Sequence, residues 1–146
     1  MRVRDRARDH RSRNSWAGIG YLLIEGTVRE LLGPGRILGN HIVLDLGNGV
    51  YAALAHLRRD SVRVKAGASV RAGQHIADCG NSGNSTEPHL HVQLMDHPRV
   101  AVAAGLPVEF DNFEVDGQRR SGVPHNGEPF VVTSPRGGGP LPPDVD

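Results

Sequence analysis

Two histidines, His89 and His91, stand two residues apart at the start of an alternating, strand-like run. Side chains alternate between the faces of a strand, so both imidazoles are expected on one face and the apolar residues between and after them on the other. Neutral imidazole is the commonest metal ligand in proteins, so the pair suits a metal site. In a chain with eight histidines, an exposed pair without a function is the competing interpretation.

A predicted β-hairpin supplies a third histidine. Residues Ile42–Leu46 are expected to form a strand with Ile42, Leu44 and Leu46 on one face and Val43 and Asp45 on the other. The pair Asn48-Gly49 that follows is the strongest short hairpin signal. The chain then returns through Val50–Leu57, which carries His56 near its end. We therefore expect His56 at the end of a second strand.

The composition favours a mostly β fold with an antiparallel sheet. The chain has 19 glycines, 10 prolines and few aromatic residues, and no segment of helical length has a 3.6-residue apolar period. Valines and glycines recur every six residues between Val62 and Ile76, a spacing that suits short strands joined by tight turns in a barrel-sandwich hybrid core. Lipoyl and biotin carrier modules share this rhythm, but the single lysine, Lys65, lacks the hairpin-tip setting of their modified lysine.

The predicted domain organisation has three parts. Residues 1–14 form an arginine-rich arm, residues 15–115 form the folded domain, and residues 116–146 form a Gly/Pro-rich tail. The arm and the tail are both expected to be disordered, the tail because its composition buries little apolar surface. The arm interleaves acids with its arginines and the net charge is only +1, so no nucleic-acid partner is expected. No apolar stretch reaches the ~20 residues of a membrane span.

Four segments, in order, resemble the lysostaphin-like zinc endopeptidases of peptidase family M23, which cut peptide cross-links of bacterial cell walls. They are Gly39–Asp45, Tyr51–Leu57, Val64–Gln74 and Gly80–His91. The resemblance extends over roughly residues 26–115, and the last segment is highly specific. It implies a duplicated hybrid motif core, one zinc ion and a peptidoglycan or other peptide substrate. For members of this family an extracellular, periplasmic or cell-wall location is expected, although the chain shows no export signal.

The resemblance also implies roles for the three histidines. In the family, the second histidine of the His-x-His pair ligates zinc, which assigns that role to His91. The first histidine of the pair and the histidine of the Ala-His-Leu element are catalytic, which assigns those roles to His89 and His56. Three protein ligands would leave one zinc position open for a water molecule, whose pKa falls to about 7 on the metal.

The chain departs from the family at the other two zinc ligands. The family's upstream His-x-x-x-Asp element does not occur before Gly39, and His10 is followed four residues later by Asn14. Three interpretations stay open. The sequence is an N-terminally truncated peptidase, or a degenerate domain that acts as a binding or regulatory scaffold, or a peptidase in which Asp9 and His10 replace the missing ligands.

Other candidate residues favour structural roles. His41 and His75 are expected to be surface or hydrogen-bonded histidines, and Cys79 a small buried hydrophobic residue. Gln93 shares the predicted face of His89 and His91, so it is a candidate for supporting a ligand through a hydrogen bond.

Overall fold

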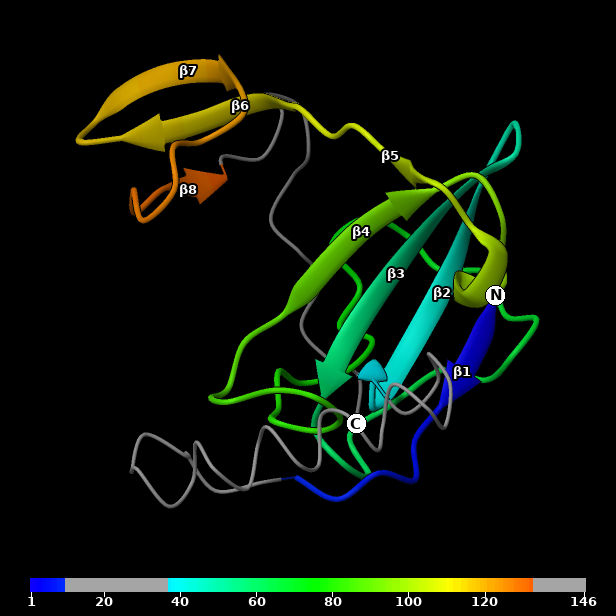
Figure 1. Cartoon of the computed structure of the whole chain (residues 1–146). Coiled ribbons are helices and arrows are strands. Elements are labelled where there is room, and N and C mark those ends of the chain that lie inside the picture. The colour runs from blue at the N-terminus through cyan, green and yellow to red at the C-terminus, as the bar shows by residue number, and fades with distance from the viewer. Residues whose placement is uncertain (10–36, 133–146) are drawn as a thin grey trace. The chain divides into compact units, whose positions relative to one another are not determined.

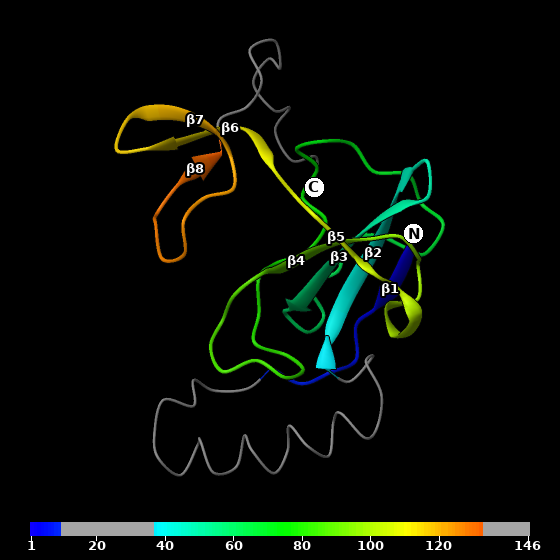
Figure 2. The same cartoon turned by 45° about the horizontal axis from the view of Figure 1, so that its top comes forward.

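The computed structural model describes residues 1–9 and 37–132. The chain divides into two compact units, Met1–Leu106 and Pro107–Asp146, and each is described by itself. In the first unit, five strands form an antiparallel sheet in the order β1-β2-β3-β4-β5 (Figures 1 and 2). These strands are β1 (Arg2–Arg4), β2 (Asn40–Gly47), β3 (Val50–Leu57), β4 (His91–Met95) and β5 (Gly105–Leu106).

The predicted hairpin between β2 and β3 is confirmed. Gly47 pairs with Val50, which leaves Asn48 and Gly49 as a two-residue loop. Both loop residues have positive φ, 52° and 77°, as a type I′ turn requires. The tight turn fixes the register that carries β3 back along β2 to His56.

The core of the first unit lies at the hairpin end of the sheet. Val43, Ala53 and Met95 come from three adjacent strands and are almost fully buried. The chain that leaves β4 returns over them through the short 3₁₀-helix η1 (Val100–Val102). His56 and His91 lie at the opposite end of β3 and β4.

The start of the arginine-rich stretch differs from the expected disordered arm. Residues Arg2–Arg4 form β1, and Val3 pairs with Ile42 of β2. Because polar and apolar residues alternate here, β1 turns Val3 inward and its arginines to solvent. Residues 10–14 of the predicted arm lie outside the described part of the chain.

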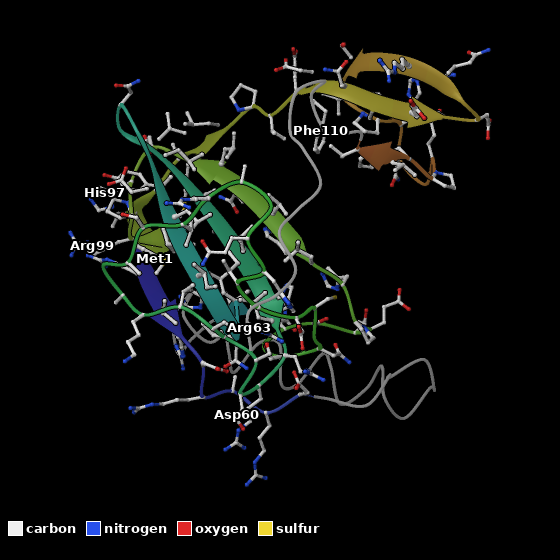
Figure 3. The ribbon with its side chains drawn as sticks, turned by 180° about the vertical axis from the view of Figure 1, so that it is seen from behind. Met1, Asp60, Arg63, His97, Arg99 and Phe110 are labelled. Atoms are coloured by element: carbon white, nitrogen blue, oxygen red, sulfur yellow. The ribbon has the colours of Figure 1, made fainter. Side chains whose placement is uncertain are left out.

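The second unit contains a three-stranded antiparallel sheet in the order β7-β6-β8. Its strands are β6 (Phe110–Val115), β7 (Gln118–Gly122) and β8 (Val131–Val132). Phe110, Phe113 and Phe130 pack together with ring centroids 5.4–6.4 Å apart, and Figure 3 shows Phe110 on β6. Strands within residues 118–132 differ from the expected disordered tail, because these three rings give the segment a small core of its own.

The prediction of a mostly β fold with antiparallel sheets is confirmed. The barrel-sandwich hybrid core stays a prediction, and residues 133–146 of the predicted tail lie outside the described part. Within the described residues, no helix is long and apolar enough to cross a membrane.

Candidate functional site

The three histidines singled out from the sequence lie together. The ring centroid of His56 is 4.7 Å from that of His89 and 5.8 Å from that of His91. His56 is the last residue but one of β3, His91 begins β4, and the loop Gly80–His89 brings His89 alongside. Three imidazoles from two strands and a loop therefore share one site.

A β-bulge turns His56 toward the other two rings. Leu57 pairs with Asn40 and Leu54 with Ile42, so β3 has one residue more than β2 between these pairs. Ala55 lies opposite His91, and regular alternation would place the next side chain, His56, on the other face. His56 instead has φ of 61°, a left-handed conformation that is rare for a residue with a side chain. The bulge redirects the imidazole to the face of His91.

One hydrogen bond fixes the orientation of the His56 ring. Its Nδ1 lies 2.8 Å from the backbone carbonyl oxygen of Ser82. A carbonyl only accepts, so Nδ1 carries the hydrogen and Nε2 of the neutral ring keeps its lone pair. Burial of the ring lowers the pKa of His56. The Ser82 hydrogen bond opposes this shift, and the charges of His89 and His91 add to it. The site therefore favours the neutral imidazole.

His89 is held in the same tautomer but lies at the surface. Its Nδ1 is 2.9 Å from the Glu87 carbonyl oxygen and 3.2 Å from Ser85 Oγ. The Ser85 hydroxyl is buried and itself donates to Glu87 O over 2.8 Å. The Nε2 atom of His89 is therefore free to accept a proton from a molecule bound at the site.

His91 and Gln93 share a face of β4, as predicted from alternation. Ala55 and Ala53, two residues apart on β3, are their cross-strand partners. His91 Nε2 lies 3.4 Å from Gln93 Oε1, which accepts its hydrogen and leaves Nδ1 with a lone pair.

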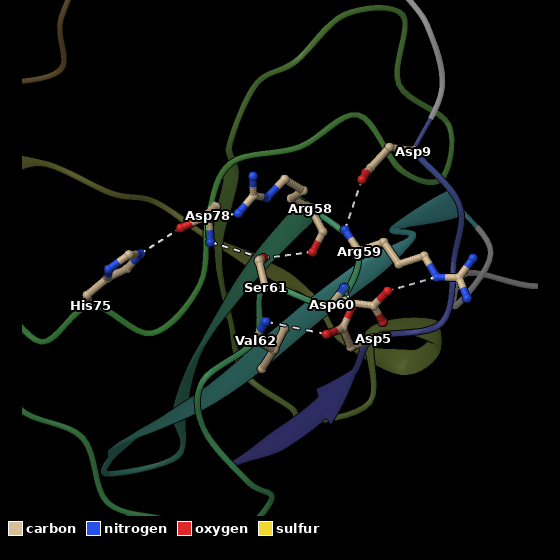
Figure 4. Close-up of polar contacts among 9 residues, drawn as sticks. All are labelled: Asp5, Asp9, Arg58, Arg59, Asp60, Ser61, Val62, His75 and Asp78. Atoms are coloured by element: carbon tan, nitrogen blue, oxygen red, sulfur yellow. Dashed lines mark hydrogen bonds and ion pairs between the residues drawn. The ribbon is translucent and has the colours of Figure 1, made fainter. Parts of the chain in front are cut away.

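The described residues do not complete a metal site. Across residues 1–9 and 37–132, no group of three or more His, Cys, Asp or Glu side chains is arranged to hold a metal ion. Asp9, one of the substitute ligands considered, uses both carboxylate oxygens on backbone amides. Its Oδ1 accepts from Asn81 N at 3.3 Å. Its Oδ2 accepts from Arg59 N at 3.0 Å, a bond that Figure 4 shows. The other substitute considered, His10, lies outside the described residues.

The other candidates singled out from the sequence include His41, His75 and Cys79. His41 is hydrogen-bonded to the Gly39 carbonyl, at 2.9 Å from its Nδ1, and His75 pairs with Asp78 at 2.7 Å (Figure 4). Both therefore have satisfied structural contacts. The prediction of a buried Cys79 is wrong, because its side chain is exposed. It lies in an isolated bridge opposite Leu57.

Sequence reasoning missed two buried residues that support the site. Asn40 and Ser82 are fully buried, and their side chains bind the end of β3 that carries His56. The sequence indicated Ser82 only as part of a turn and Asn40 only as part of the family-like segment. Nothing local in the sequence links two residues that stand 42 positions apart.

The first unit thus combines an antiparallel β-sheet with three imidazoles clustered at the loop Gly80–His89. Sequence comparison assigns the family: residues 23–104 match the model of peptidase family M23, and the chain belongs to this family. It is 38% identical over 72 residues to peptidoglycan DD-endopeptidase ShyA of Vibrio cholerae, an alignment covering 48% of this chain. It is 33% identical over 102 residues to glycyl-glycine endopeptidase ALE-1 of Staphylococcus capitis, covering 64% of this chain. Over 87 residues it is 33% identical to lysostaphin of Staphylococcus simulans, covering 53% of this chain.

These alignments cover small parts of the relatives. The matched region is 16% of ShyA, 28% of ALE-1 and 17% of lysostaphin. No solved structure matches the chain. Membership of the family implies zinc and a peptidoglycan substrate, while the relatives' complete activities belong to proteins several times longer.

Proposed function

We propose that this chain carries the histidine side of a zinc-dependent peptidase site and hydrolyses peptide bonds of peptidoglycan cross-links. The observation that carries the proposal is the approach of the His56 ring to within 4.7 Å and 5.8 Å of the two rings of the His-x-His pair. The names of the relatives support the substrate class, since ShyA is a peptidoglycan endopeptidase. We extend the hybrid-motif core of the family to this chain as part of the same proposal.

The proposal gives each imidazole a role that its hydrogen bonds permit. His91, with Nδ1 free, is the zinc ligand. His56 and His89 each donate Nδ1–H to a backbone carbonyl, so each can accept and return a proton at Nε2. Such proton transfer contributes typically 10²–10⁴-fold to the rate of hydrolysis. Hydrolysis needs a proton to be taken from the attacking water and another to be given to the departing amine. The buried, neutral His56 and the exposed His89 together suit these two proton transfers.

Zinc enters the proposal through the family and through one assigned ligand. The described residues do not fit a complete zinc site by themselves, because His91 alone has a ligand role among them. We therefore derive no step through the ion and assign only the proton-handling residues around its expected position.

The test is hydrolysis of purified peptidoglycan by the purified chain, measured as newly released amino groups. The proposal predicts release that a chelator abolishes and that added zinc restores. If peptidoglycan is bound but no amino groups appear at any zinc concentration, the chain is a binding scaffold and the catalytic proposal is wrong.

A further inference from the structure

The Leu57 carbonyl, one residue beyond His56, receives two side-chain donors. Asn40 Nδ2 lies 3.2 Å and Ser82 Oγ 2.8 Å from this oxygen. Ser82 Oγ in turn accepts a hydrogen bond from Asn40 N at 3.0 Å. All three residues are at most 3% exposed, so water does not compete for these bonds. The three residues form a closed, buried network, which we call the Leu57 clamp.

The Leu57 clamp lies where the backbone needs support. A residue with a side chain in the left-handed region costs about 1–3 kcal/mol, and such a conformation persists only when its surroundings hold it. His56 adopts this conformation, and the backbone is held on both sides of it. Its own amide donates to Leu38 O at 3.0 Å, and the clamp holds the carbonyl of Leu57. The clamp therefore secures the bulge that aims His56 into the site.

Ser82 contacts His56 in a second way. Its hydroxyl belongs to the clamp, while its own carbonyl accepts the His56 Nδ1 hydrogen. One residue thus fixes both the backbone that carries the ring and the ring's hydrogen-bonding atom. A shift of Ser82 would therefore have two effects at once: it would displace the bulge, and it would leave the His56 ring free to rotate.

Asn40 extends the network to the N-terminal segment and has no spare capacity. Its Oδ1 accepts from the amides of Arg6 and Ala7 at 2.7 Å and 2.6 Å. Its Nδ2 donates to Ala7 O at 2.9 Å as well as to Leu57 O. Every donor and acceptor of this buried amide is used, so its orientation is determined.

We propose that Ser82 and Asn40 are positioning residues for His56: they hold its bulge and keep its Nδ1 hydrogen-bonded, so that Nε2 faces the reacting atoms. This inference rests on the proposed peptidase function for its catalytic consequence. Its structural content, the fixed ring of His56, stands independently of activity.

Ser61 provides a matched control. It is buried, its Oγ donates to Arg58 O at 2.7 Å, and the same Oγ accepts from Asp78 N at 3.1 Å (Figure 4). The Ser61 hydroxyl thus resembles that of Ser82: each donates to a backbone carbonyl and accepts from a backbone amide. The structure records no bond from Ser61 to a histidine among its contacts.

The experiment compares Ser82→Ala, Ser82→Thr and Ser61→Ala in the full chain. The His56 ring N–H is followed by NMR in histidine labelled with ¹⁵N, and denaturant unfolding gives the stability of each variant. Ser82→Ala keeps the carbonyl that accepts the His56 Nδ1 hydrogen but removes the hydroxyl that ties Ser82 to Leu57 O, so the carbonyl is held less firmly. Exchange of the His56 Nδ1 hydrogen is therefore expected to speed up by about fivefold, the factor that corresponds to about 1 kcal/mol, the scale of one hydrogen bond. Ser82→Thr, which keeps the hydroxyl, should show the exchange rate of the wild type. Ser61→Ala should lose about as much unfolding free energy as Ser82→Ala, while the exchange rate of the His56 Nδ1 hydrogen stays that of the wild type.

Asn40→Asp is the second variant. It keeps the shape of the side chain and loses the donor to Leu57 O, so it should speed the same exchange. A His56 signal that is unchanged in both Ser82→Ala and Asn40→Asp would overturn the proposal.

Activity separates this proposal from the peptidase proposal. With peptidoglycan as substrate, Ser82→Ala should lower kcat about tenfold with little change in KM. The misplaced His56 ring transfers protons less well, while the contacts that bind the substrate are unchanged. Equal kcat in Ser82→Ala and wild type would overturn the positioning role. If no variant and no wild-type protein hydrolyses peptidoglycan, the peptidase proposal fails, and the NMR comparison still decides whether Ser82 and Asn40 fix the ring.

Discussion

The Nδ1 atom of His56 lies 2.8 Å from the carbonyl oxygen of Ser82, a residue 26 positions further along the chain. This bond joins the end of β3 to the glycine-rich loop that leads to His89 and His91. The carbonyl of Ser82 therefore sets the tautomer of one histidine and ties it to the loop that delivers the other two.

Removing the proposed zinc ligand should weaken zinc binding. We expect His91→Ala to lower the affinity for zinc by more than the roughly 10- to 100-fold that loss of an outer-shell partner costs. His125→Ala, at an exposed position in the second unit, should bind zinc as the wild type does. Competition with a chromophoric chelator measures both, and equal affinities would show that His91 is not a ligand.

Asp9 should act as a structural tie and not as a ligand. Its carboxylate joins the amides of Arg59 and Asn81, which lie in the two segments that meet at the Leu57 clamp. Asp9→Ala should lower the free energy of unfolding by about 1–2 kcal/mol, the scale of two hydrogen bonds to a charged but exposed group. Urea unfolding measures this loss. A large fall in zinc affinity in the same variant would instead support Asp9 as a substitute ligand.

Gly83 should tolerate no side chain, because the loop touches the backbone before β2. A Cβ at Gly83 would collide with backbone atoms of Ile37 and Gly39, and its φ is 73°. Gly49 has a similar φ of 77° with nothing near its Cβ position, so Gly49→Ala reports the cost of the conformation alone. We expect about 1–2 kcal/mol for Gly49→Ala and about 1–3 kcal/mol more for Gly83→Ala. Equal losses in thermal unfolding would contradict the close packing of this loop.

Stability should fall as the pH drops below 6.5, in part through His41. Burial lowers the pKa of His41 below its ordinary value of 6.5; the Gly39 carbonyl opposes this shift and the charge of Arg4 adds to it. Below pH 6.5 the unfolded chain therefore protonates His41 while the folded chain keeps it neutral. The free energy of unfolding falls from pH 6.5 downward until the pKa of His41 in the folded state is reached. His41→Gln should flatten this part of the profile, and His125→Gln should leave it as steep as in the wild type.

Short-range pattern predicted much of the fold near the site. The Asn48-Gly49 pair predicted its hairpin because only a few residue pairs accept two positive φ angles. The period of two predicted that His91 and Gln93 share a face, which the cross-strand pairs confirm. Both features depend on local geometry, and local geometry can be read along the sequence.

Features that depend on contacts between distant segments were not predicted. Alternation alone places His56 on the wrong face, since the bulge that redirects it is held by Ser82 and Asn40. Composition suggested a disordered tail, yet Phe130 packs against Phe110 and Phe113 of β6 with ring centroids 5.4 Å and 5.6 Å apart.

The central claim is that the clustered imidazoles transfer protons during peptide hydrolysis, and His89→Ala tests it most directly. His89 is exposed, so its loss should leave the fold intact. The measurement is the rate of amino-group release from purified peptidoglycan with zinc present, for wild type, His89→Ala and the distant control His75→Ala. The account predicts a loss of about 10²–10⁴-fold in His89→Ala and a rate close to wild type in His75→Ala. Equal rates in wild type and His89→Ala would contradict it.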